Sequence, residues 1–170
     1  KSDINIVFED TNLKVIKYKD NNIIEEKDLL VILPYIKYEG IIILKHEYLP
    51  AYNYIYRNND QFKDVNNFLT VITGEAEVGE TYANAIRRIL YKESGLVLSN
   101  MFIFEINNSY FINKTNTSRY IPVLIELNFN DYKETIPDYN DNKLLDKVSK
   151  CIKISLADIN NIRCHDLITS

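Results

Sequence analysis

The chain has 170 residues, of which 46% are hydrophobic, and this is enough for one globular unit with a buried core. Its 24 acidic and 20 basic residues give a formal net charge of -4 and are scattered, so the sequence creates no strong field for nucleic acid or an anionic membrane. The two cysteines match neither a disulfide framework nor a zinc pattern, and no segment approaches the roughly 20 apolar residues of a membrane span, so we expect a cytoplasmic protein.

The first half of the chain is rich in strand patterns. Residues 1–28 alternate polar and apolar side chains around a turn at 20–22, which predicts a small antiparallel meander. Residues 29–36 and 41–44 are short apolar runs joined by the turn 37–40. Runs of this length indicate buried strands, so we expect a central hairpin here.

A well-defined helix follows the next strand. Residues 68–73 form a β-rich run that leads directly into Gly74. Thr81 is a suitable N-cap for a helix whose apolar residues recur at helical spacing, and Gly95 lies where a left-handed C-terminal residue is wanted.

The second half contains fewer clear elements. Residues 101–106, 120–127 and 151–154 are predicted strands, and 156–162 is a predicted short helix. Strands before and after a helix, combined with hairpins, indicate an α/β layer architecture.

The segment from Gly74 to Leu96 has a regular frame of glycines and charged residues. Glycines allow the loop to fold tightly against the helix, and Glu80 and Arg88 are placed to form an ion pair that fixes the loop. The spacing closely resembles the Nudix box, Gly-x5-Glu-x7-Arg-Glu-U-x-Glu-Glu-x-Gly-U, in which U is aliphatic. The positions in register are Gly74, Glu80, Arg88, Leu90, Glu93, Gly95 and Leu96.

Three flanking segments resemble the ADP-ribose pyrophosphatase branch of that superfamily. Residues 44–51 (LKHEYLPA) are similar to its Leu-Val-Arg-Gln-Tyr-Arg-Pro-Ala, residues 70–80 to its loop, and residues 152–170 to its closing strand, helix and tail. The resemblance implies an α/β/α sandwich with a mixed sheet over 29–170. In that branch an N-terminal meander serves dimerisation, so 1–28 is the expected dimerisation element of a homodimer.

The resemblance also implies an activity, the magnesium-dependent cleavage of a nucleoside diphosphate linked to another group. By the same resemblance Glu93, Arg88 and Glu80 are the catalytic candidates, and Glu93 with the backbone carbonyl of Thr73 would hold the metal. The residues expected to bind a nucleotide-like ligand are Tyr48, Thr73, Gly74 and Glu77. Magnesium or manganese is the expected cofactor of an active site, and an inactive site needs none.

The sequence departs from the family at the metal-binding acids. The family has three glutamates at helix positions i, i+3 and i+4, which gathers them on one face, whereas this chain has Ile89, Lys92 and Glu93 there. Magnesium needs hard oxygen ligands in near-octahedral order. A lysine charge about 5 Å from the ion would cost roughly 6 to 7 kcal/mol at an effective dielectric near 20. The sequence therefore predicts a fold that is kept and a reaction that is impaired or lost.

Other groups offer weaker candidates. Glu75 and Glu77 are possible replacement ligands, and His46 beside Glu47 is a possible ligand or proton carrier, although a lone strand histidine is more often simply hydrogen-bonded. The late acidic candidates are Glu134, Asp138, Asp141 and Asp146, and the aromatic candidates for stacking on a base are Tyr48, Tyr52, Tyr54 and Tyr56. Cys164 and His165 are expected to pack in the tail.

Three functions stay open at this point. The chain is a nucleotide-ligand-binding module, an active Nudix hydrolase that rebuilds its metal site from other acids, or a protein-interaction scaffold. Loss of two of the three acids favours binding or scaffolding over hydrolysis, because activity depends on the site and not on the fold.

Overall fold

The computed structural model describes residues 4–11, 13–47, 54, 68–100, 102–128, 130–134 and 150–161. The strands are β1 (Ile4–Glu9), β2 (Lys14–Tyr18), β3 (Asn21–Glu25), β4 (Leu29–Ile36), β5 (Ile41–Glu47), β6 (Phe68–Thr70), β7 (Ile72–Glu75), β8 (Leu96–Leu98), β9 (Ile103–Ile106), β10 (Tyr110–Phe111), β11 (Arg119–Leu127), β12 (Tyr132–Glu134) and β13 (Lys150–Ser155). The helices are α2 (Tyr82–Ser94) and the 3-10 helix η2 (Leu156–Asn161).

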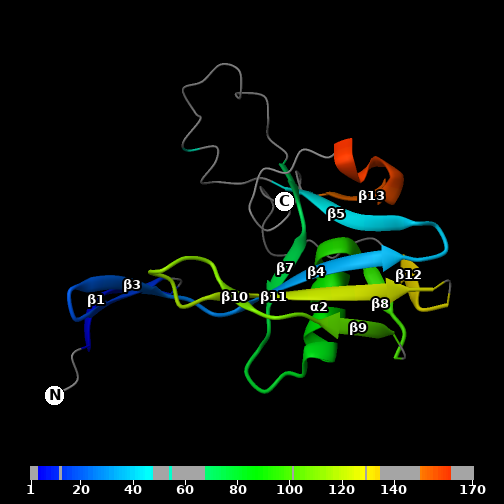
Figure 1. The fold of residues 1–170 in the computed structure, drawn as a ribbon. Helices are drawn as coiled ribbons and strands as arrows, with labels where there is room; N and C mark the ends of the chain where they lie inside the picture. Colours follow the sequence, from blue (N-terminus) through cyan, green and yellow to red (C-terminus); the bar gives the residue numbers. More distant parts are fainter. Residues whose placement is uncertain are drawn as a thin grey trace.

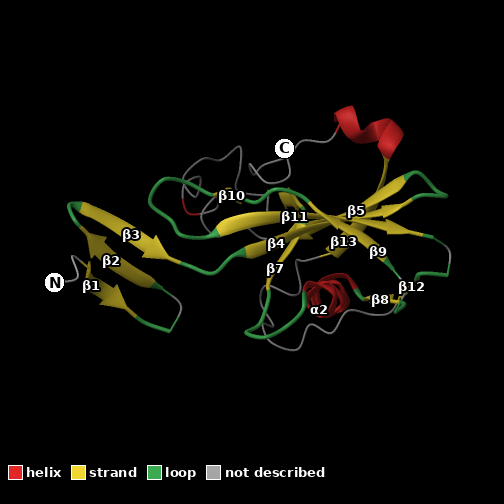
Figure 2. Ribbon diagram, turned by 60° about the horizontal axis from the view of Figure 1, so that its bottom comes forward, coloured by secondary structure: helices red, strands yellow, loops and turns green. Residues whose placement is uncertain are grey.

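The predicted N-terminal meander is confirmed as a sheet of its own. Its three strands pair antiparallel in the order β1-β2-β3. Figure 2 shows this sheet standing apart from the mixed sheet. The end of β3 is tied to a later loop, because the Ile24 N–H donates to Thr115 O at 2.8 Å and the Thr117 N–H donates to Ile24 O at 3.0 Å.

The remaining strands form a mixed sheet with the path β10-β11-β4-β5-β13 (Figure 1). Strands β11 and β4 run parallel over eight residue pairs, and β4–β5 and β5–β13 are antiparallel. β9 adds to the outer side of β11, and β8 pairs with β12 in a separate two-stranded ribbon. Strands β8, β10 and β12 have only two or three residues each, which is too short for an alternation pattern to predict them.

The central hairpin opens soon after its turn. β4 and β5 pair only at Tyr35 with Ile42 and at Ile36 with Ile41. Beyond this point residues 68–75 enter between the two strands, β6 pairing with β5 and β7 with β4. This insertion brings the segment before the predicted loop to the middle of the sheet.

Both faces of the mixed sheet carry apolar side chains. On the face toward α2, the core includes Ile32, Ile72, Ile86, Leu90 and Ile125, all fully buried. The opposite face has a second cluster of Val31, Ile42, Leu44 and Val71. Each fully buried side chain of this size contributes about 1.5 to 3 kcal/mol, so the two-sided pattern of β4 fixes this strand at the centre.

Helix α2 begins and ends as the sequence predicts. The Thr81 side chain accepts a hydrogen bond from the Asn84 N–H at 3.3 Å, and Gly95 adopts a left-handed conformation with φ of 72°. A left-handed residue after the last turn lets the Gly95 N–H bond to Tyr91 O, which ends the helix.

The helical layers lie on both sides of the sheet, with α2 on one side and η2 on the other (Figure 2). The predicted helix at 156–162 is a 3-10 helix that ends at Asn161 within the described residues. Its first turn is held by the Ser155 hydroxyl, which accepts from the Ala157 N–H at 3.2 Å. Such tight helices are typical of short connections. Among the described helices, none has the length and apolar character needed to cross a membrane.

Candidate functional site

The loop between β7 and α2 is fixed by the predicted ion pair of Glu80 and Arg88. Arg88 Nε donates to Glu80 Oε1 at 2.9 Å and an Arg88 terminal nitrogen donates to Glu80 Oε2 at 2.6 Å. The same arginine also donates to Glu75 O at 2.8 Å, and the Glu77 N–H donates to Glu80 Oε2 at 3.0 Å. The hydrogen bonds from Arg88 and the Glu77 N–H lower the pKa of Glu80 to about 2. The loop is therefore held by charge-assisted bonds in one conformation.

Gly74 and Ile89 are in direct contact beneath this loop. A Cβ placed on Gly74 would lie 2.7 Å from both Cδ1 and Cγ1 of Ile89, which is closer than real Cβ atoms come to a neighbour. The φ angle of Gly74 is not positive, so glycine is required here by close approach and not by backbone conformation. Ile89 is 3% exposed and belongs to the core. The position of the first family acid thus holds a buried apolar side chain.

Glu93, the one acid that remains, is paired with a lysine that sequence reasoning did not identify. Lys45 on β5 forms an ion pair with Glu93 and lies 3.4 Å from Glu47 Oε2. The Lys45 side chain is 11% exposed. Burial alone would lower the pKa of Lys45, but the hydrogen bond and charge of Glu93, with the charge of Glu47, outweigh burial and raise it. Lys45 is therefore a largely buried ammonium whose charged form is favoured by two carboxylates.

Neighbouring strands complete this cluster, which we call the Lys45 cluster and define as Lys45, Glu47, Thr70, Glu93 and Cys151. The register places Thr70 and Cys151 opposite Lys45 on β6 and β13. The Thr70 hydroxyl donates to Glu47 Oε1 at 2.6 Å, and the Cys151 thiol donates to the backbone O of Glu93 at 3.5 Å. Burial of Cys151 raises the pKa of its thiol to about 11, so the thiol is neutral. The cluster contains two carboxylates and one ammonium.

The other predicted site residues are spread over the loop and helix. Thr73 and Gly74 pair with Val31 and Leu30 in the β7–β4 ladder, and Glu77 is exposed with its carboxylate 3.7 Å from Arg88 Nε. Lys92 is exposed on α2. His46 lies half-buried on the strand between Lys45 and Glu47, and so points to the opposite face of the sheet.

Several candidates cannot be placed. Eight candidates lie outside the described residues: Tyr48, Tyr52, Tyr56, Asp138, Asp141, Asp146, Cys164 and His165. Tyr54 is 67% exposed, and Glu134 is exposed in an ion pair with Lys153 at 2.5 Å.

The described residues do not fit a magnesium or manganese ion. Among them, no group of three or more histidine, cysteine, aspartate or glutamate side chains is placed to hold a metal. The carboxylates of Glu93 and Glu47 are directed at an ammonium instead. A lysine charge about 4 Å from a divalent ion would cost about 8 kcal/mol at an effective dielectric near 20, which equals the whole free energy of micromolar binding.

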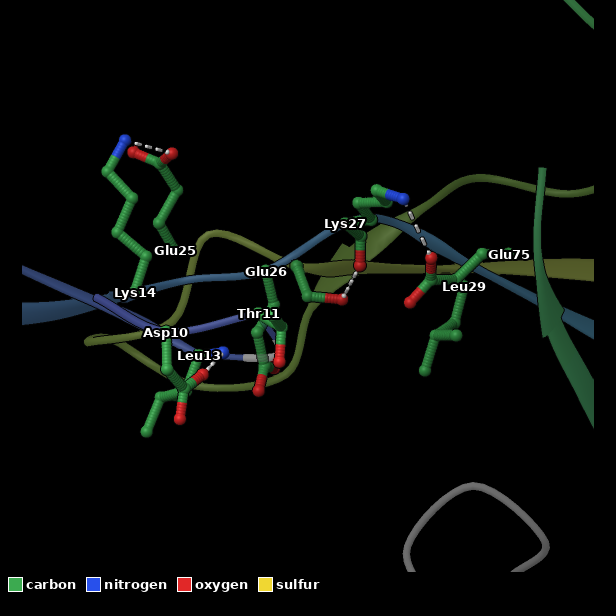
Figure 3. A pocket seen from close by; sticks show the side chains of 10 residues that line it. Asp10, Thr11, Leu13, Lys14, Glu25, Glu26, Lys27, Leu29 and Glu75 are labelled. Atoms are coloured by element: carbon green, nitrogen blue, oxygen red, sulfur yellow. Dashed lines mark hydrogen bonds and ion pairs between the residues drawn. The ribbon is translucent and has the colours of Figure 1, made fainter. Parts of the chain in front are cut away.

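A hollow of about 700 Å³ lies between the meander and the mixed sheet (Figure 3). Its lysines are already paired, Lys14 with Glu25 at 2.8 Å and Lys27 with Glu75 at 3.3 Å. Four acidic side chains and two lysines line it, which gives a formal charge of -2. This charge repels phosphate groups, so the hollow is a poor site for a nucleotide diphosphate.

Comparison with solved structures decides the fold. The chain superposes on an ADP compounds hydrolase with a TM-score of 0.62 over 93% of this chain and 78% of that one, at 14% sequence identity. It also matches MutT, from a study of the psychrophilic fish pathogen Aliivibrio salmonicida and the mesophile Vibrio cholerae, with a TM-score of 0.50 over 81% and 87% of the two chains at 13% identity.

The chain has a Nudix fold. The α/β class, the mixed sheet and the meander predicted from the sequence are thereby confirmed. No protein-family model matches the sequence, and no curated protein does. Likeness at this level of identity establishes the Nudix architecture, and the activity of the site has to be argued from its own residues.

The residue that sequence reasoning missed had left a signal in the sequence. Lys45 stands where the resembling motif Leu-Val-Arg-Gln-Tyr-Arg-Pro-Ala has valine, and it interrupts an apolar strand at a position that shares a face with buried Ile43. A lysine on a buried strand face requires an acidic partner. That partner is Glu93, which the helix brings to the same place.

Proposed function

We propose that this chain is a Nudix-fold module that binds a nucleotide-like ligand and does not carry out metal-dependent hydrolysis. The observation that carries the proposal is the burial of Ile89 against Gly74. Hydrolysis of the kind that the resemblance implies depends on carboxylates that clamp a metal and activate water. An apolar side chain that is 3% exposed and fills the space above Gly74 supplies no oxygen ligand and leaves no room for one.

Retention of the loop supports ligand binding. The Glu80–Arg88 pair and the close Gly74–Ile89 contact hold the loop and helix in a defined arrangement although two of the three acids are replaced. One of the structures with the same fold is described as an ADP compounds hydrolase, which indicates the ligand class to test first. A nucleoside diphosphate joined to a second group is therefore the proposed ligand.

A thermal-shift experiment with ADP-ribose tests this proposal. The chain is melted alone, with ADP-ribose, and with ADP-ribose plus magnesium or manganese. We expect ADP-ribose to raise the melting midpoint equally with and without metal, by an amount set by RT ln(1 + [L]/Kd). Stabilisation only in the presence of metal would contradict the metal-independent site. No stabilisation by any member of a panel of nucleotide sugars and dinucleotides would contradict ligand binding.

A second role, association of two copies through the meander, is supported by the exposure of β1. Ile4, Ile6, Val7 and Phe8 are each between 49% and 59% exposed, so both faces of this edge strand present apolar surface. Exposed apolar edge strands pair readily with other chains. We expect light scattering to show a dimer for the full chain and a monomer for the variant Ile6→Lys plus Phe8→Lys. A monomeric parent chain would contradict this role.

A further inference from the structure

The Lys45 cluster is a built arrangement of charge in the interior. Lys45 shares the strand face of Ile43, which belongs to the core beneath α2, and so its side chain runs toward the helix. There it meets Glu93, and it meets Glu47 from its own strand. The side chains of Lys45, Glu47 and Glu93 are 11%, 26% and 25% exposed, so water screens them only in part.

We propose that the Lys45 ammonium is a built-in cation that joins α2 to β5 and excludes divalent metal ions from this end of the Nudix helix. The proposal deepens the proposed function, because it names the residue that makes the site independent of metal. It rests on a specific geometry, in which two carboxylates from different elements converge on one ammonium group.

Within the Lys45 cluster, Glu47 and Glu93 are the charged partners of the ammonium, and the other two side chains are neutral. The Thr70 hydroxyl donates a hydrogen bond to the Glu47 carboxylate, and the neutral Cys151 thiol donates one to the backbone oxygen of Glu93. The two carboxylates would repel each other without a cation between them, since like charges a few ångströms apart destabilise the folded state. Lys45 removes this repulsion.

The charged positions of the strand and the helix differ from those of the resembling motifs. Those motifs have valine at the position of Lys45 and glutamate at the positions of Ile89 and Lys92. This chain therefore carries a cation at a strand position where the motif is apolar, and its helix has lost two anions, one of them to Lys92. In the motif, several glutamates would need a bound divalent ion to balance their charge. In this chain the Lys45 ammonium balances the charges of Glu93 and Glu47.

Removing the ammonium should convert the cluster into a weak cation site. In the variant Lys45→Met, Glu47 and Glu93 still converge, and carboxylate oxygens are the ligands that hard divalent ions prefer. The matched control is Lys37→Met, which breaks a surface pair with Glu126 of 2.9 Å. The double variant Lys45→Met plus Glu93→Gln removes one of the converging carboxylates.

The experiment measures thermal melting of the four proteins without ligand, in chelated buffer and in about 10 mM manganese chloride, with sodium chloride at equal ionic strength. We expect Lys45→Met to melt roughly 10 °C below the parent chain in chelated buffer, because removing the ammonium leaves the partly buried carboxylates without a compensating charge. Manganese should raise its midpoint by about 3 °C or more, as expected for millimolar affinity. The parent, the Lys37→Met control and the double variant should not respond.

The proposal is overturned if manganese stabilises the parent chain as much as Lys45→Met, or if Lys45→Met gains no more than the double variant. If Lys45→Met is unfolded in chelated buffer, recovery of its folded state on refolding in manganese supports the proposal, and no recovery overturns it. The measurement contains no nucleotide. Its failure is therefore distinguishable from failure of ligand binding, which the ADP-ribose experiment reports separately.

Discussion

The contact between Gly74 and Ile89 gives the sharpest test of how the loop packs on the helix. We consider the substitutions Gly74→Ala and Ile89→Ala, separately and together. In the parent chain an added Cβ at Gly74 would lie 2.7 Å from two atoms of Ile89, whereas ordinary contact begins at 3.4 Å. Neither side can move easily, because Ile89 belongs to the core and Gly74 is paired to Leu30 in the sheet.

The magnitudes follow from overpacking and cavity formation. Gly74→Ala forces a shift in the packed interior and should cost about 1 to 3 kcal/mol of the free energy of unfolding. Ile89→Ala removes a fully buried side chain and should cost about 2 to 5 kcal/mol. In the double variant the new methyl group enters the space that Ile89 vacated. Its loss in free energy of unfolding should therefore be smaller than the sum of the two single losses by about 1 kcal/mol or more.

Urea unfolding followed by circular dichroism measures all four proteins. The parent and the three variants should unfold with the same slope against denaturant, which makes the free energies comparable. Ile16→Ala, a buried change in the meander sheet outside the core cluster that contains Ile89, provides a control when combined with Gly74→Ala, and the two changes should be additive. Strict additivity of the Gly74 and Ile89 substitutions would refute the packing described for this loop.

Three further predictions concern the loop, the helix cap and the buried thiol. The pKa of Glu80 is lowered from its ordinary 4.5 to about 2, so its contribution to stability is complete above pH 4.5 and is lost as the pH falls toward 2. Glu80→Gln should therefore melt below the parent at neutral pH, and the difference should shrink between pH 4.5 and 2. Thr81→Ala should lose about 1 kcal/mol in urea unfolding and Thr81→Ser almost nothing, and equal losses would contradict the capping bond. Burial raises the pKa of Cys151 to about 11, so little reactive thiolate is present at pH 8. In a Cys164→Ser chain, alkylation of Cys151 at pH 8, measured by mass spectrometry, should be at least about tenfold slower in the native than in the denatured state.

The sequence was sufficient to predict the elements with strong local signals. The helix from Tyr82 to Ser94 follows from a capping threonine, an apolar stripe and a terminal glycine, and all three act locally. The meander and the apolar strands β4 and β5 follow from alternation and from short apolar runs. The ion pair of Glu80 and Arg88 could be predicted because a regular spacing placed both groups beside the same loop.

The Lys45 cluster could not be predicted because its members come from three strands and a helix that local patterns do not bring together. Glu93 was expected to face a metal, and it pairs instead with a lysine 48 positions earlier in the chain. The same limit applies to the opening of the β4–β5 hairpin, where residues 68–75 enter between strands that are adjacent in sequence. Both features depend on tertiary pairing.

The structure gives a physical basis to the proposal that the fold is kept while its reaction is lost. Glycine and apolar positions of the Nudix frame hold the loop on the helix through the Gly74–Ile89 contact. The acidic positions are reassigned, with Ile89 in the core and Glu93 bound to Lys45. In the proposed account, apolar packing takes the place of a metal ligand at Ile89, and the Lys45 ammonium takes the place of the metal charge beside Glu93.

Hydrolysis by the unmodified chain tests the central claim most directly. Release of nucleoside monophosphate from ADP-ribose and a panel of nucleotide sugars is followed with magnesium and with manganese, beside an active ADP compounds hydrolase as the positive control. The account predicts no metal-dependent turnover above the rate in buffer. Saturable turnover that depends on magnesium or manganese and disappears in Glu93→Gln would contradict it.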